Sequence, residues 1–111
     1  MFCILVTLDV NNAKRYRSYM ILSFGNKDTQ SIAEGTRVPK FSPFEKIARR
    51  KLRQLEIAND VSDLRVPPGN HLEALQGDRK GQYSIRINDQ YRVCFYWRNG
   101  GAEQVEIVDY H

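Results

Sequence analysis

The first half of the chain carries apolar residues at helical spacing. One amphipathic helix is predicted over residues 42–58, with an apolar stripe formed by Phe44, Ala48, Leu52 and Leu55. Ser42 is its predicted N-cap, while Pro43 lies in the first turn and Glu45 completes a capping box. The opposite face is basic, because it carries Lys46, Arg49, Arg50 and Arg53. That face is either a solvated helix surface or a docking surface for an acidic partner or nucleic acid.

A shorter helix is predicted before it, over residues 27–34. Asn26 can cap its start and Gly35 can end it. The preceding residues, 20–24, are rich in apolar side chains and stop at a Gly-Asn pair, which predicts a short opening strand. The first half therefore predicts one strand followed by two helices.

The second half changes to a period of two, which is typical of half-buried strands. A loop rich in proline and glycine, residues 66–70, separates the two halves. Four strands are expected, over residues 71–76, 83–87, 91–97 and 103–110. Tyr83, Phe95 and Trp97 fall on the apolar side of this alternation and are predicted core residues, with stacking on nucleic-acid bases as the alternative role. The pattern predicts an α+β fold, with two N-terminal helices packed on a mainly antiparallel sheet of four to five strands.

Composition narrows the class of protein. The chain has 111 residues, enough for one domain with its own core, and it carries a net charge of +4. Cys3 and Cys94 lie too far apart to suggest a zinc site or a disulfide framework, so we expect no metal and a reducing cytoplasm. No apolar run approaches the roughly 20 residues of a membrane span, so no membrane partner is expected.

Residues 1–19 differ from the rest of the chain. Phe2 begins an apolar run that no positive charge precedes, which makes a poor signal peptide. We expect an N-terminal extension, from a mis-set start codon or disordered, with the functional domain spanning residues 20–111 and starting at Met20. The alternative is that residues 3–8 form an extra edge strand.

The last three residues carry the most distinctive chemistry. Asp109, Tyr110 and His111 follow directly on an apolar-rich stretch, residues 105–108. A chain end frays unless it is tied down, and a docked final strand would fix these ionisable side chains in place. All three groups can move protons, and in a protein with excess positive charge they suit work on a phosphodiester.

From residue 64 onward the chain resembles HigB-type toxins of the RelE/ParE superfamily. The resemblance rests on the Gly77-Asp78 turn, the run Ile87-Asn88-Asp89-Gln90-Tyr91-Arg92 and the Asp-Tyr-His end, which occur together and in order. It extends more loosely back to residues 20–24. It implies a bacterial, cytoplasmic type II toxin of RelE-like fold that cleaves messenger RNA on the ribosome without a metal or cofactor. The implied partner is a HigA-like antitoxin with a helix-turn-helix domain, through which alone the toxin would reach operator DNA.

The implied reaction is attack of a ribose 2′-hydroxyl on the adjacent phosphate, which needs a base, a cation and an acid. By position in the motif, Arg92 is the expected cation, and Asp109, Tyr110 and His111 are the expected terminal triplet. Family members carry Leu-His-Pro-Leu-Lys-Gly-Asp where this chain has residues 72–78, so Glu73 replaces a catalytic histidine and Gln76 a lysine. A carboxylate near pKa 4.3 is a weaker base than an imidazole near 6.5, and we expect a toxin of mild activity with Glu73 as base.

Four further side chains are candidate contacts to RNA. Alternation along the predicted strand 71–76 sends His71 to the same face as Glu73. Arg79, Lys80 and Arg86 are expected to meet the RNA backbone, in contacts that salt weakens and that do not read sequence.

Two alternatives stay open. A ParE-like toxin shares the fold but inhibits DNA gyrase, and the Asp-Tyr-His end argues against it because gyrase binding needs no proton transfer. An inactive homologue that only binds its antitoxin or operator is favoured by the substitution at Glu73.

Overall fold

The computed structural model describes residues 21–110. The predicted extension over residues 1–19, the start of the opening strand at Met20, and the side chains of Cys3 and His111 all lie outside the described residues. No helix in the described part is long and apolar enough to cross a bilayer.

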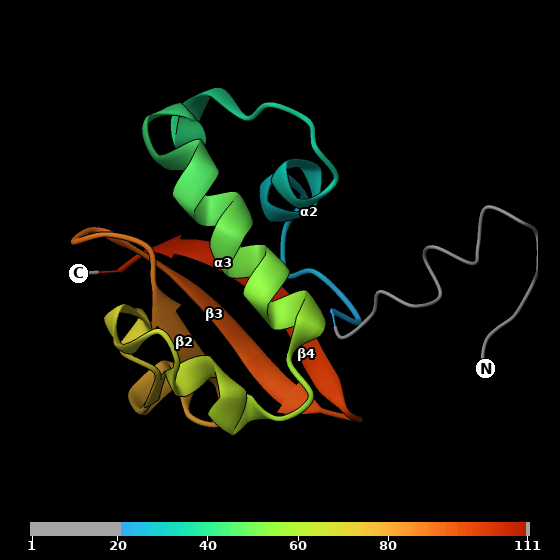
Figure 1. The fold of residues 1–111 in the computed structure, drawn as a ribbon, viewed down its shortest axis with the longest axis vertical. Helices are drawn as coiled ribbons and strands as arrows, with labels where there is room; N and C mark the ends of the chain where they lie inside the picture. The colour runs from blue at the N-terminus through green and yellow to red at the C-terminus, as the bar shows by residue number, and fades with distance from the viewer. Residues whose placement is uncertain (1–20, 111) are drawn as a thin grey trace, which may run out of the picture.

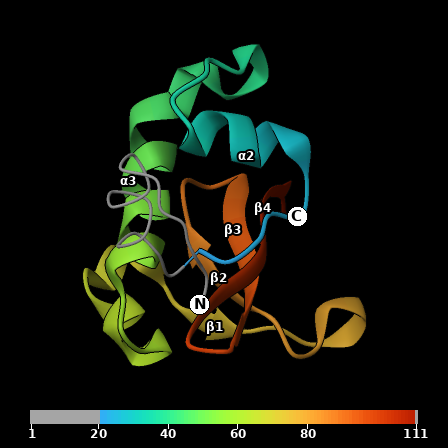
Figure 2. The ribbon, with the colours of Figure 1, turned by 90° about the vertical axis from the view of Figure 1, so that its right-hand side faces the viewer.

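The molecule has a helical layer on a four-stranded sheet (Figure 1). The helices are α2 (Lys27–Ala33) and α3 (Glu45–Ile57), and α3 crosses in front of β3 and β4 in that view. The strands are β1 (Glu73–Ala74), β2 (Tyr83–Arg86), β3 (Tyr91–Arg98) and β4 (Gly101–Asp109). They pair antiparallel in the order β1-β2-β3-β4, a meander that Figure 2 shows from the side. The predicted α+β fold is confirmed.

Helix α2 forms where it was predicted. The Asn26 side chain accepts a hydrogen bond from the Thr29 backbone N–H at 2.9 Å, and Gly35 follows the helix with a φ of +96°. Such a positive φ favours glycine, because a side chain would clash with the backbone there.

The predicted start of α3 is wrong. Residues Pro39–Phe44 form a 3₁₀ helix, and α3 begins at Glu45 without a side-chain cap. The Ser42 hydroxyl accepts a hydrogen bond from the Arg37 guanidinium at 3.0 Å, and it donates or accepts no capping bond at the start of α3. The predicted apolar stripe is nevertheless buried, as Ala48, Leu52 and Leu55 are at most 2% exposed.

The first predicted strand of the meander is much shorter than expected. A 3₁₀ turn at Pro68–Asn70 precedes it, and His71 adopts a left-handed conformation with φ +44°. Extended pairing can therefore begin only at Glu73, and β1 has two residues where six were predicted. Two further 3₁₀ helices, Val61–Arg65 and Gly77–Arg79, shape the connections on either side.

The opening segment lies along β4 in a parallel orientation. Isolated bridges join Ile21 to Ala102 and Phe24 to Val105, in place of a continuous strand. The register of β4 shifts near Gln104, whose φ is +53°, and this irregularity interrupts the pairing. The core lies between the helices and the sheet and includes Ile32, Phe41, Leu52, Leu55, Ile85, Val93, Phe95 and Val105. Tyr83 and Trp97, predicted as core, are partly buried against it.

A buried polar cluster joins α3 to the connection that precedes β1. The Lys51 ammonium donates to the Asn70 side-chain oxygen at 2.6 Å, and the Asn70 amide donates to Gln54 and to the Leu64 carbonyl. Asn70 is fully buried, and burial is the main cause that lowers the pKa of Lys51. The amide is thus a satisfied hydrogen-bonding centre, which is the form in which proteins bury polar groups.

Candidate functional site

The candidate site is centred on Arg92, in the middle of the sheet. Strand register places Arg92 opposite Arg86 on β2 and Val108 on β4. Its Nε–H donates to the Ser84 hydroxyl at 2.7 Å, and its Nη2 donates to the His71 carbonyl at 2.6 Å. The side chain is 13% exposed. These bonds fix the plane of the guanidinium while an edge of it remains at the surface.

Glu73 approaches Arg92 from one flank. Its carboxylate lies 3.7 Å from the Arg92 Nη2, and the Glu73 side chain is 54% exposed. Glu73 occupies the two-residue strand β1, where register places it opposite Ser84. The replaced histidine position of the family motif is therefore part of the same cluster as the central arginine.

Tyr110 approaches Arg92 from the other flank, after the end of β4. The Arg92 Cζ lies 5.8 Å from the centre of the Tyr110 ring, within the range of a cation–π contact. The Tyr110 backbone N–H donates to the Gln90 carbonyl at 2.7 Å. The strand order β1-β2-β3-β4 thus places Glu73 and Tyr110 on opposite sides of the arginine.

The Asp109 side chain lies on the opposite face of the sheet from Arg92. Asp109 pairs with Tyr91, whereas Val108 pairs with Arg92, and successive residues of a strand face opposite ways. The Asp109 carboxylate accepts a hydrogen bond from the Gln90 side chain at 3.0 Å. Of the terminal triplet, the structure brings Tyr110 to Arg92 and places Asp109 beside the β2–β3 turn.

The predicted RNA contacts fall into distinct environments. Arg79 is bound to Glu106 and to Gln82, both at 3.1 Å, so this turn arginine is held against β4. Lys80 is exposed, and Arg86 pairs with Asp89 in the next turn. His71 contributes its backbone carbonyl to Arg92. The alternation argument for the His71 side chain is wrong, because His71 precedes the strand and is left-handed.

The floor of the cluster contains two residues that sequence reasoning did not assign. Ser84 and Cys94 pair across β2 and β3, and both are fully buried. Burial raises the pKa of the Cys94 thiol to about 11, with nearby charges making smaller contributions, so it is neutral at physiological pH. Ser84 lies on the polar side of the predicted alternation, but its role as an acceptor for Arg92 depends on the strand register, which the sequence does not reveal.

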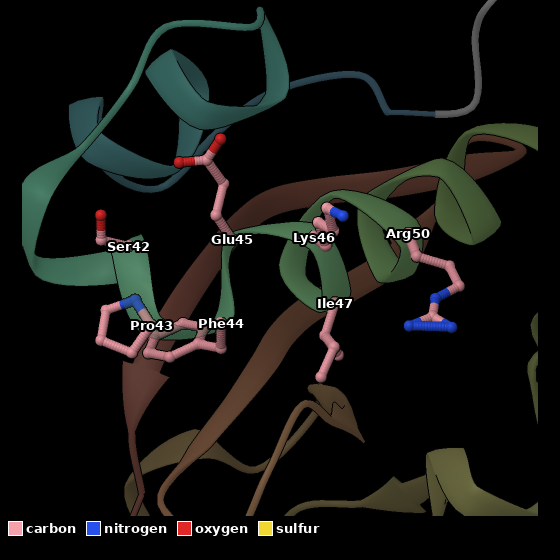
Figure 3. A pocket seen from close by; sticks show the side chains of 7 residues that line it. All are labelled: Ser42, Pro43, Phe44, Glu45, Lys46, Ile47 and Arg50. Atoms are coloured by element: carbon pink, nitrogen blue, oxygen red, sulfur yellow. The ribbon is translucent and has the colours of Figure 1, made fainter.

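Among the surface hollows lined by residues 21–110, two are of sufficient size for a ligand and are considered as sites. One, of about 550 Å³, lies at the start of α3 and is lined by Ser42, Pro43, Phe44, Glu45, Lys46, Ile47 and Arg50 (Figure 3). The other, of about 410 Å³, lies at the sheet edge beside β1 and is lined by Arg65, Leu72, Glu73, Ala74 and Tyr83. The second shares Glu73 with the Arg92 cluster, whereas the first shares no residue with it.

The cations on the basic face of α3 differ in whether they form ion pairs. Arg49 is bound to Glu45 at 2.8 Å and to the Ile32 carbonyl, which ties it to the helical layer. Lys46 and Arg50 are exposed, and Figure 3 shows them on α3 beside Ile47. Within residues 21–110 neither forms an ion pair with a carboxylate.

Comparison with known proteins identifies the family. Residues 34–111 match the family model of the RelE-like toxin of type II toxin–antitoxin system HigB. The chain is 42% identical over 85 residues to Toxin HigB-1 of Vibrio cholerae serotype O1, covering 75% of this chain and 90% of that toxin. It is 30% identical over 94 residues to Endoribonuclease HigB of Proteus vulgaris, covering 83% of this chain and 100% of that enzyme. The chain therefore belongs to the HigB-like toxins of type II toxin–antitoxin systems.

Proposed function

We propose that this toxin is an endoribonuclease that cuts messenger RNA on the translating ribosome and so arrests growth. The similarity to Endoribonuclease HigB of Proteus vulgaris over that enzyme's whole length supports RNA cleavage. The observation that carries the proposal is the fixed Arg92 guanidinium with a carboxylate on one flank and a phenol on the other.

The chemistry of this arrangement fits cleavage by an internal nucleophile. The ribose 2′-oxygen forms a bond to phosphorus while the bond from phosphorus to the 5′-oxygen breaks, which leaves a 2′,3′-cyclic phosphate. Entering and leaving oxygens of an in-line displacement lie on opposite sides of the phosphorus. Glu73 takes the 2′-hydroxyl proton on one side, and the Tyr110 phenol protonates the 5′-oxygen on the other. No metal ion is needed for these transfers.

Arg92 is suited to bind the phosphate between them. Two of its nitrogens, Nε and Nη2, already donate to Ser84 and His71. Within residues 21–110 the Arg92 Nη1 donates no hydrogen bond, so its donors are available to a phosphoryl oxygen. A guanidinium held by other bonds meets developing charge without reorganising, which is the source of most electrostatic catalysis.

The partners follow from family membership and charge. A type II toxin has an antitoxin, and we infer a HigA-like one with a helix-turn-helix domain that alone contacts operator DNA. The ribosome presents the messenger RNA, and the reaction takes place in the bacterial cytoplasm. Arg79, Lys80 and Arg86 contribute positive charge that favours an RNA backbone, and the strand register places Arg86 directly opposite Arg92.

One observation favours a second candidate, an inactive homologue that binds only its antitoxin. The Glu73 carboxylate lies within ion-pair distance of Arg92, where it competes with a phosphate for the same guanidinium. In such a homologue this ion pair would serve only to stabilise the fold.

Induction of the toxin in a bacterial host, followed by mapping of messenger RNA 5′ ends, separates these functions. The ribonuclease produces new internal ends only while translation continues, and Arg92→Ala removes them. Co-purification of Arg92→Ala with the antitoxin shows that the variant is folded. Growth arrest without new internal ends would indicate a gyrase inhibitor, and unaffected growth would indicate the inactive homologue.

A further inference from the structure

The hollow at the sheet edge has the form of a nucleotide site. It lies where the end of the 3₁₀ helix Val61–Arg65 and the segment before β1 meet the outermost strands. Its volume of about 410 Å³ falls within the range of small-ligand sites, roughly 300–1,000 Å³. A single base with its ribose fits a hollow of this size.

The lining combines an apolar surface with two charges. Leu72 and Tyr83 are partly buried hydrophobic side chains packed against the core. The Tyr83 ring stacks on Phe95, with ring centres 6.2 Å apart and planes 27° apart, which holds the phenol ring in place. Aromatic rings fixed in this way are the usual platforms for bases of single-stranded RNA.

The two charged residues of the lining, Arg65 and Glu73, can serve different parts of a nucleotide. Arg65 is exposed and lies at the end of its 3₁₀ helix, where its guanidinium can meet a backbone phosphate. Glu73 lines the same hollow and lies 3.7 Å from Arg92. Glu73 therefore connects the hollow to the position proposed for the scissile phosphate.

The proposed roles fix which nucleotide enters. A base at Glu73 must contact the 2′-hydroxyl of the nucleotide on the 5′ side of the cut, so that ribose lies at the rim of the hollow. We propose that the hollow binds this nucleotide, with its base against Tyr83 and Leu72 and its own 5′-phosphate at Arg65. The inference rests on the proposed function and adds that the toxin selects the base directly before the cut.

The test uses translated reporter messages that carry each of the four bases in turn before a mapped cut. The wild-type toxin is expected to prefer some of the four. Tyr83→Leu and Arg65→Gln are each expected to lower kcat/KM about tenfold, and Tyr83→Leu to reduce the base preference. Arg50→Gln on α3 is the matched control for Arg65→Gln, because Arg50 is also exposed but does not line this hollow, and the variant should preserve the base preference.

The outcomes separate this inference from the proposed function. If the wild type cuts and Arg92→Ala does not, but both edge variants cut with wild-type rate and preference, the hollow is not a nucleotide site. If the wild type makes no cut, the proposed function and this inference fail together. Because Tyr83 packs against the core, Arg65→Gln provides the decisive measurement if Tyr83→Leu does not fold.

Discussion

Two regions of this toxin carry cations near the surface, and they hold them differently. In the sheet, Arg92 is bound to Ser84 and to the His71 carbonyl and is 13% exposed. On the outer face of α3, Lys46 and Arg50 are exposed and form no ion pair within residues 21–110. A held guanidinium has already lost its side-chain entropy and can act on developing charge, whereas a solvated one supplies long-range attraction.

A third cation, Lys51, is held in the interior of the molecule. Lys51 lies on the inner side of α3 and donates to Asn70 in the interior. Like Arg92 it is nearly buried and hydrogen-bonded, but within residues 21–110 no carboxylate forms an ion pair with it. The comparison therefore depends on position in the sheet as well as on fixation.

The largest effect is expected when Arg92 itself is replaced. Arg92→Lys keeps the positive charge but removes the planar guanidinium and its hydrogen bond from Nε to Ser84. Arg92→Ala removes the charge as well. We expect Arg92→Ala to lower kcat/KM for translated messages about 10²–10³-fold, and Arg92→Lys to recover little of that loss. Cleavage by Arg92→Lys at the wild-type rate would show that positive charge alone is sufficient. The fixed guanidinium of Arg92 would then have no advantage over the solvated cations of α3.

Asn70→Ala tests the contribution of the buried Lys51–Asn70 hydrogen bond to stability. The change leaves the Lys51 ammonium and the Leu64 carbonyl without their buried partner, so the free energy of unfolding is expected to fall by about 2–3 kcal/mol. Urea unfolding followed by circular dichroism measures this. The variant should cut at the wild-type rate at temperatures where it is folded, and a selective loss of cleavage would link this cluster to the site.

Glu73→His sharpens the assignment of the base. A neutral imidazole accepts a proton more readily than a carboxylate, so we expect roughly tenfold faster cleavage at pH 7.5. The variant's rate should fall as the pH drops below about 6.5, because the protonated imidazole cannot act as a base. Glu73→Gln, which cannot accept the proton, should be slower than wild type. Equal rates for Glu73→Gln and wild type would exclude Glu73 as the base.

The smallest effect is expected on the outer face of α3. The double change Lys46→Gln with Arg50→Gln removes two solvated charges and should weaken binding to ribosomes only a few-fold, with a shallower dependence on salt. The rate of cleavage at saturating ribosome concentration should not change. A large fall in that rate would place the groove of Figure 3 in the catalytic step.

Much of this arrangement could be predicted from sequence because it depends on local pattern. Alternation identified β2, β3 and β4, and the Asn26 cap identified α2. The start of α3 could not be predicted, because Arg37 competes for the Ser42 hydroxyl and two prolines favour a 3₁₀ turn. The Arg37–Ser42 hydrogen bond joins residues five positions apart, and a capping pattern that considers only Ser42 and Glu45 does not contain it.

The candidate site shows the same limit. Motif position predicted Arg92, Glu73 and Tyr110, and the fold brings them together. The pairing of Arg92 with Ser84 requires the register of β2 against β3, and the turning away of Asp109 requires the register of β4. Register is a tertiary property, and a shift of one residue would exchange the two faces.

The outer edge of β4 is closed by the first part of the described chain. Leu22 and Gly25 donate to the carbonyls of Ala102 and Val105, Val105 donates to the Ser23 carbonyl, and Ile107 donates to the Thr29 hydroxyl. An exposed edge strand is a template for another chain, and here those backbone groups are already satisfied. A binding partner cannot extend the sheet on this side without first displacing residues 21–25, so recognition of this edge must proceed through side chains.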